Sequence, residues 1–151
     1  MIDRSGSMGP NVNELREAMQ LFLRSLPSDC YFNIIGFGSS YECFFPHSRL
    51  YNDETLTLAS DHVSHLNANL GGTEILEPLK YIFKTESIPN YARQIFVLTD
   101  GEVDNTEEVI QLISKNVQNS RVFSLGIGNS VSHYLVRKSK RKSKKRTKDN
   151  K

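Results

Sequence analysis

The sequence predicts an α/β protein, in which a doubly wound, mostly parallel β-sheet has helices on both faces. Two observations support this prediction. Three short runs are almost continuously apolar, which is typical of strands buried on both faces of a sheet, and they lie at residues 31–37, 95–98 and 122–127. Between these runs, apolar residues recur at the spacing of an amphipathic helix. Alternating strands and helices are the pattern of parallel strands joined by helical crossovers.

The first elements are a helix and a pair of strands. Asn11, with Glu14 three residues later, is typical of a helix start, and apolar residues at helical spacing follow until Pro27. We expect a buried strand over residues 31–37. A Gly-Ser-Ser turn then leads into a short strand over residues 41–45, and such a tight connection predicts antiparallel pairing with the preceding strand.

The remaining elements follow in the order helix, helix, strand, helix, strand and short helix. Helical spacing of apolar residues marks the helices, and continuous apolar runs mark the strands. We expect these elements at residues 56–66, 76–83, 95–98, 104–117, 122–127 and 131–136.

The charge is divided between an acidic domain and a basic arm. Residues 137–151 carry ten Lys/Arg and one acid, whereas residues 1–136 carry 9 basic and 16 acidic side chains, a net charge of −7. We therefore predict one domain over residues 1–136, which attracts cations, and a disordered tail over residues 137–151. A tail this basic is also typical of nuclear-import signals and nucleic-acid contacts, although it offers no aromatic side chain for base stacking.

The sequence predicts a cytoplasmic protein, with a nuclear location open through the basic tail. Cys30 and Cys43 lie in apolar, strand-like runs, and two buried thiols fit a reducing compartment better than a disulfide framework. No apolar run approaches the ~18 residues of a membrane span, and the N-terminus has no signal segment, so we expect no membrane partner.

Five oxygen-bearing side chains are predicted to meet at one edge of the sheet. Ligands in open α/β sheets bind beyond the carboxyl ends of the strands, and the two acids of this set come at such ends. Glycines beside the hydroxyl residues let the backbone turn and approach closely. Carboxylate and hydroxyl oxygens suit Mg²⁺ or Mn²⁺ rather than zinc or copper. The predicted ligands are Asp3, Ser5, Ser7, Thr73 and Asp100.

This pattern resembles the metal-ion-dependent adhesion site of von Willebrand factor A domains. Three segments around these residues are similar to the intracellular von Willebrand factor A domain-containing protein 5 group. They are CYFNIIGFGSSYECFFP, LGGTEILEPL and FVLTDGEVDNT, and the resemblance covers about Ile2 to Val136. It implies a Rossmann-like fold with Mg²⁺ (or Mn²⁺) bound by the five residues, Asp100 acting through water. It also implies a protein partner whose acidic side chain fills the open metal position.

The resemblance is partial at both ends. The family domain has an apolar strand before its first Asp, in the middle of the sheet, and continues past Gly128 to a last strand and helix. We therefore expect the first central strand and the C-terminal strand to be missing, with a gap in the sheet. A buried strand contributes ~1.5–3 kcal/mol per apolar side chain, so a truncated, poorly folded relic is one alternative to a working module.

Other functions fit these residues less well. A metal-dependent phosphotransfer or hydrolytic enzyme is not predicted, because no Lys or His lies in the motif loops and no phosphate-binding Gly-x-x-x-x-Gly-Lys occurs. Thr73 is also a candidate helix N-cap, and Asp100 is a candidate cap for the helix that follows it. A basic-tailed nuclear or nucleic-acid-associated protein remains the second alternative.

Overall fold

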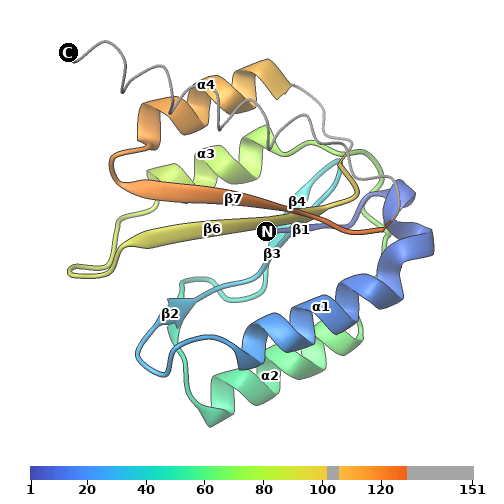
Figure 1. Ribbon diagram of the computed structural model, residues 1–151, viewed down its shortest axis with the longest axis horizontal. Helices are drawn as coiled ribbons and strands as arrows, with labels where there is room; N and C mark the ends of the chain where they lie inside the picture. The colour runs from blue at the N-terminus through green and yellow to red at the C-terminus, as the bar shows by residue number, and fades with distance from the viewer. Residues whose placement is uncertain (102–105, 129–151) are drawn as a thin grey trace, which may run out of the picture.

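A five-stranded sheet forms the centre of the computed structural model, which describes residues 1–101 and 106–128 (Figure 1). Its strand order is β4 (Tyr41–Cys43), β3 (Ile35–Phe37), β1 (Ile2–Asp3), β6 (Arg93–Thr99) and β7 (Ser120–Gly126). The pairs β3–β1, β1–β6 and β6–β7 are parallel, and β4 is antiparallel to β3. The predicted mostly parallel sheet and its antiparallel edge strand are confirmed.

Helices cover both faces of this sheet (Figure 1). A 3₁₀ segment, η1 (Gly6–Asn11), leads into α1 (Val12–Arg24), which lies with α2 (Asp53–Ser64) on one face. The other face carries α3 (Leu76–Lys84) and α4 (Thr106–Asn116). The first four predicted helices are thus confirmed, although the first residues of the fourth lie outside the described part of the chain.

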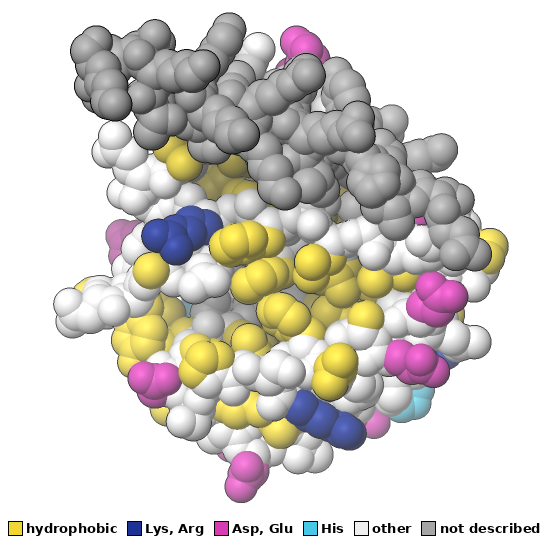
Figure 2. Space-filling view, viewed as in Figure 1, with side chains coloured by type: hydrophobic (Ala, Val, Ile, Leu, Met, Phe, Trp, Pro, Cys, Tyr) yellow, Lys and Arg dark blue, Asp and Glu magenta, His cyan; other side chains and the backbone are white. Residues whose placement is uncertain are grey.

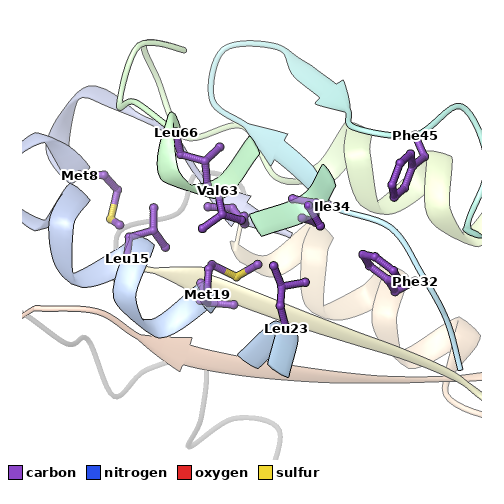
Figure 3. Close-up of a cluster of buried hydrophobic side chains, with 12 residues drawn as sticks. Met8, Leu15, Met19, Leu23, Phe32, Ile34, Phe45, Val63 and Leu66 are labelled. Carbon is purple, nitrogen blue, oxygen red and sulfur yellow. The ribbon is translucent and has the colours of Figure 1, made fainter. Parts of the chain in front are cut away.

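The larger hydrophobic core fills the space between α1, α2 and the sheet (Figure 3). Helix α1 points Leu15, Met19 and Leu23 toward α2 and the sheet, and each is at most 5% exposed. Burial of side chains this size contributes about 1.5–3 kcal/mol each, so this packing holds α1 firmly against the sheet. Because α1 follows η1, the packing also fixes the loop that joins β1 to the helix.

Helix α2 begins three residues earlier than predicted because of a reciprocal cap. The Asn52 side chain accepts a hydrogen bond from the Thr55 backbone N–H (2.9 Å), and the Thr55 hydroxyl accepts one from the Asn52 N–H (3.0 Å). Such a capping box satisfies two amides that have no partner within the helix. The apolar spacing does not reveal this start, because both capping residues are polar.

The single strand predicted over residues 31–37 is wrong, because two strands occupy this run. Strand β2 (Tyr31–Phe32) leaves the main sheet and pairs antiparallel with β5 (Arg49–Leu50), whereas β3 stays in the centre. The break between the two strands lies at Asn33. The side-chain amide of Asn33 donates to the Phe45 carbonyl (2.8 Å) and accepts from the Phe45 N–H (3.0 Å). A side chain that bonds backbone groups in this way takes the place of backbone hydrogen bonds between strands.

The expected gap at the first central strand is occupied by β1. Ile2 lies opposite Gly36 on one side and Leu98 on the other, and Asp3 lies opposite Phe37. Two residues suffice to join β3 to β6 because both neighbours supply parallel partners. The expected loss of a C-terminal strand, the short helix over 131–136 and the tail over 137–151 lie outside the described residues.

The outer strand β7 keeps an apolar face. Phe123 and Leu125 are 40% and 43% exposed, whereas Val122 of the same strand packs against the core on the side of α3 and α4. In Figure 2 hydrophobic side chains gather in the middle of the view, where β6 and β7 run in Figure 1. Within the described residues, the helices therefore cover one face of β7 and leave the other open.

None of the helices within residues 1–101 and 106–128 has the length and apolar character that a membrane crossing requires.

Candidate metal centre

The two predicted acidic ligands lie at neighbouring strand ends. Asp3 is the last residue of β1, and Asp100 directly follows β6, which pairs with β1 in parallel. Both carboxyl groups are buried, Asp3 at 0% exposure and Asp100 at 6%. Parallel strands end at the same edge of a sheet, so the order of the strands alone brings together residues that are ninety-seven positions apart.

Both oxygens of Asp3 accept hydrogen bonds. The Ser5 backbone N–H donates to Oδ1 (2.9 Å), and the Thr99 hydroxyl donates to Oδ2 (2.7 Å). A carboxylate offers about four acceptor positions, so these two bonds leave acceptor capacity for a further ligand. The two bonds fix the direction in which the remaining lone pairs point.

The environment of Asp3 is unfavourable for its negative charge. Burial raises the pKa of Asp3 above its usual value, hydrogen bonds from Ser5 and Thr99 oppose that shift, and the negative charge of Asp100 adds to it. A buried carboxylate with a second carboxylate beside it is stabilised by a nearby positive charge. The pair therefore has the electrostatics of a cation site.

Two hydroxyl groups extend the site toward solvent. The Ser5 and Ser7 Oγ atoms are 2.9 Å apart, with Ser5 buried and Ser7 exposed. Neighbouring ligands on an octahedral Mg²⁺ with bonds of about 2.1 Å are separated by about 3.0 Å. The spacing of these hydroxyls therefore fits two adjacent positions of such an ion, with the exposed side next to Ser7.

The loop that carries Thr73 lies against the loop of the two serines. The Gly6 N–H donates to the Gly71 carbonyl (2.8 Å), and Gly71 has a φ of +80°, a conformation that favours glycine. Thr73 is half-buried two residues later, and its side chain makes no hydrogen bond within residues 1–101 and 106–128. The structure thus brings the two loops together, while no hydrogen bond joins the Thr73 side chain to the other four candidate ligands in this part of the chain.

The alternative role of Thr73 as a helix cap is not observed. Helix α3 has Ile75 at its N-cap position, without a side-chain cap, and the Leu76 N–H bonds to the Glu74 carboxylate instead (2.8 Å). The Thr73 hydroxyl is therefore not engaged by the helix that follows it.

Thr99 belongs to the candidate site although the sequence did not single it out. Its hydroxyl contacts Asp3 and also accepts from the Gly101 N–H (3.2 Å), and its backbone carbonyl accepts from Ile127 (2.9 Å). A single threonine thus links β1, β6 and the chain after β7. Strand register is the signal that points to Thr99. Ile2 pairs with Leu98, so the next residues, Asp3 and Thr99, lie side by side at the rim of the sheet.

The site depends on hydroxyls as much as on acids. Within the described residues, no group of three or more His, Cys, Asp or Glu side chains could hold a metal ion. Two carboxylates with serine and threonine hydroxyls form an all-oxygen set, which suits hard divalent cations.

The family model of the von Willebrand factor type A domain matches residues 1–138. A relative from Rattus norvegicus, von Willebrand factor A domain-containing protein 5A, is 48% identical over 147 residues. That match covers 91% of this chain but 18% of the relative, so the chain spans less than a fifth of its length.

Two solved structures share the fold. A von Willebrand factor type A protein from Catenulispora acidiphila superposes with a TM-score of 0.74 at 25% identity, covering 91% of this chain and 34% of the other. The manganese-loaded TRAP protein of Plasmodium vivax superposes with a TM-score of 0.65 at 20% identity, covering 89% of this chain and 57% of the other.

Proposed function

This chain belongs to the von Willebrand factor type A domain family, and from that premise we propose that it is a protein-binding module whose binding depends on a divalent metal ion. The observation that carries the proposal is the buried Asp3 carboxylate beside Asp100, with the Ser5 and Ser7 hydroxyls next to it. A metal-dependent contact to a partner needs this combination of fixed negative charge and an exposed edge.

Five residues would hold the ion, which we propose to be Mg²⁺ or Mn²⁺. They are Asp3, Ser5, Ser7, Thr73 and Asp100. The all-oxygen donor set supports this choice of metal, as does the manganese carried by the Plasmodium vivax protein of the same fold. A bound divalent ion supplies positive charge and an open coordination position.

We propose that an acidic side chain of a protein partner takes that open position. Ser7 is exposed while Asp3 and Ser5 are buried, so a partner approaches the ion from the side of Ser7. In this proposal the site serves recognition rather than catalysis, and the carboxylates and hydroxyls act as metal ligands. The location that we propose is the cytoplasm. Cys30 and Cys43 are free thiols, which support this proposal, although they are half-buried and not fully buried as expected.

The test compares acidic and amidated ligands with and without metal. The full chain is presented to an immobilised pool of peptides that each contain one Asp or Glu, and to a matched pool with Asn or Gln in its place. In buffer that contains about 5-fold more Mg²⁺ than EDTA, we expect the acidic pool to retain the chain. Retention on the amidated pool should be roughly tenfold weaker, and the Asp3→Asn variant should not be retained on the acidic pool. Equal retention in EDTA, or on both pools, contradicts the proposal.

The basic tail favours one second candidate, a nucleic-acid contact through residues 137–151, which carry ten Lys/Arg. Such binding weakens steeply with salt, because each neutralised phosphate releases counterions. A duplex that binds the full chain with a steep salt slope, and does not bind a chain lacking 137–151, would support it. Salt-independent binding, or binding that survives the deletion, contradicts it.

A further inference from the structure

We propose that Arg4 is a positioning residue of the metal centre, which holds the Thr73 loop in place at the rim of the sheet. This inference rests on the proposed function, since it concerns how the same site is assembled. It assigns a role to the residue between Asp3 and Ser5, which is not itself a candidate ligand.

The backbone of Arg4 is bonded on both sides at the end of β1. Its N–H donates to the Phe37 carbonyl at the end of β3 (2.8 Å), and its carbonyl accepts from the Leu70 N–H (2.9 Å). Arg4 is therefore the point where the sheet edge meets the segment between α2 and α3. That segment, residues 65–75, contains neither a helix nor a strand.

The guanidinium of Arg4 holds that segment with two of its three nitrogens and β4 with the third. Nε donates to the Asn67 carbonyl (3.0 Å), Nη2 donates to the Asn69 side-chain oxygen (2.6 Å), and Nη1 donates to the Glu42 carboxylate on β4 (2.7 Å). The Arg4 side chain is only 11% exposed, although its partners lie at the surface and the Glu42 side chain is 61% exposed. A planar, forked cation makes three such contacts in fixed directions, which a lysine cannot.

Space for the side chain comes from a glycine on the neighbouring strand. A Cβ added to Gly36 would lie 2.6 Å from the Arg4 Cδ atom, which is too close for any side chain to fit without displacing Arg4. The stem of Arg4 therefore crosses β3 directly over Gly36 on its way to Glu42. The path of this side chain is fixed by packing as well as by its hydrogen bonds.

The contacts of Arg4 continue directly into the part of the loop that carries Thr73. The Leu70 carbonyl accepts from the Ser39 N–H (2.6 Å), the Gly71 carbonyl accepts from Gly6 (2.8 Å), and the Gly72 N–H donates to the Ser39 hydroxyl (2.8 Å). Thr73 is the next residue. Arg16 also holds the start of this segment at Leu66 and Asn67, so loss of the Arg4 contacts loosens mainly the part from Asn69 onward. Residues without regular structure depend on such anchors.

The sign of the effect on metal affinity separates this role from two others. Removing a positive charge near a cation site would tighten metal binding if Arg4 acted by its charge, because like charges repel. A purely structural role would lower the unfolding temperature without changing affinity. Positioning predicts weaker binding, and residues that orient metal ligands typically contribute roughly 10–100-fold to affinity.

The experiment measures Mn²⁺ affinity of the full chain by electron paramagnetic resonance of free Mn²⁺, at a temperature where each variant is folded. We expect Arg4→Met to weaken Mn²⁺ binding about tenfold, and Arg4→Lys, which keeps the charge but not the fork, to weaken it as well. Arg93→Met is the matched control. Arg93 makes three backbone hydrogen bonds to Ile82, Thr85 and Glu86, so its loss should lower stability but not affinity.

A double-mutant cycle tests whether Arg4 acts through Thr73. If it does, Arg4→Met combined with Thr73→Val weakens Mn²⁺ binding no more than the larger single change, whereas independent effects multiply. Asn69→Ala removes one partner of the guanidinium at an exposed position, and it provides the same test at lower risk to folding. We expect it to weaken binding about threefold, without adding to Arg4→Met.

The outcomes distinguish this inference from the proposed function. If wild-type protein binds Mn²⁺, Asp3→Asn abolishes binding and Arg4→Met and Asn69→Ala bind within twofold of wild type, the role of Arg4 is wrong and the metal centre stands. Tighter binding by Arg4→Met, or multiplicative effects with Thr73→Val, also overturns it. If wild type and Asp3→Asn both fail to bind Mn²⁺, the proposed function and this inference fall together.

Discussion

Replacing Asp3 with asparagine separates the cost of its charge from its use in metal binding. Asparagine keeps the shape of the side chain and can bond the same two partners, although the bond to Thr99 exchanges donor and acceptor. Its Oδ1 atom can accept from the Ser5 N–H, and its amide can donate to the Thr99 hydroxyl, which turns to accept. The change thus removes the negative charge while leaving the packing at the end of β1 intact.

The metal-free and metal-bound proteins should respond in opposite directions. Burial and the neighbouring Asp100 raise the pKa of Asp3, which means that the fold disfavours its charged form. Without metal, Asp3→Asn should therefore unfold at a higher temperature than wild type at pH 7. With metal at 100 times its dissociation constant, wild type should gain about 2.7 kcal/mol, and the variant should gain nothing.

Differential scanning fluorimetry of both proteins, in EDTA and in Mn²⁺, measures these effects. For a chain of 151 residues, 1 kcal/mol shifts the midpoint by roughly 2–4 °C, so the metal-dependent shift of wild type should be roughly 5–11 °C. Ser114→Ala, at an exposed position on α4 whose hydroxyl donates to the Ile110 carbonyl, should keep the full shift and serves as the control. Equal metal-dependent shifts in wild type and Asp3→Asn would refute this reasoning.

Three further predictions follow from the buried contacts. Thr99→Val should lower the free energy of unfolding by about 1–3 kcal/mol in urea titrations, because a buried Asp3 oxygen loses its donor, whereas Thr99→Ser should lose less than half of that. Because the pKa of Asp3 is raised in the folded state, metal-free wild type loses stability relative to Asp3→Asn as pH rises from 3.8 through the folded pKa. In paired thermal melts across pH 3.5–7, the difference between the two unfolding temperatures should widen with pH. A constant difference would contradict this prediction. Asn33→Ala should cost about 2–4 kcal/mol in urea titrations because both bonds to Phe45 are lost, while Asn119→Ala, at an exposed position, should stay within about 0.5 kcal/mol of wild type.

The sequence predicts that the two acids of the candidate site lie close together, for a reason of topology. Asp3 and Asp100 each follow an apolar run, and parallel strands end at one edge, so their proximity follows from the fold class. The pairing of Ser5 with Ser7 is likewise local, because the two residues share one short loop. The place of Thr73 in the ligand set stays a prediction, although its loop contacts Gly6.

Other features could not be predicted because they depend on side chains that reach across the molecule. The apolar run over residues 31–37 gives no sign that Asn33 will bond Phe45 twelve residues later and divide the strand. Apolar content indicates burial, and both halves of the run contain buried side chains. It does not reveal which backbone groups a polar side chain will bond.

Periodicity and the order of motifs along the chain thus determined the fold class, the positions of the helices and the acids at the strand ends, because these depend on local spacing. Only the tertiary structure decided that two residues complete the centre of the sheet, that Thr99 orients Asp3, and that Arg4 joins the sheet edge to the Thr73 loop. Each of these depends on contacts between residues more than thirty positions apart, and the register of strands and loops that creates them forms only when the chain packs.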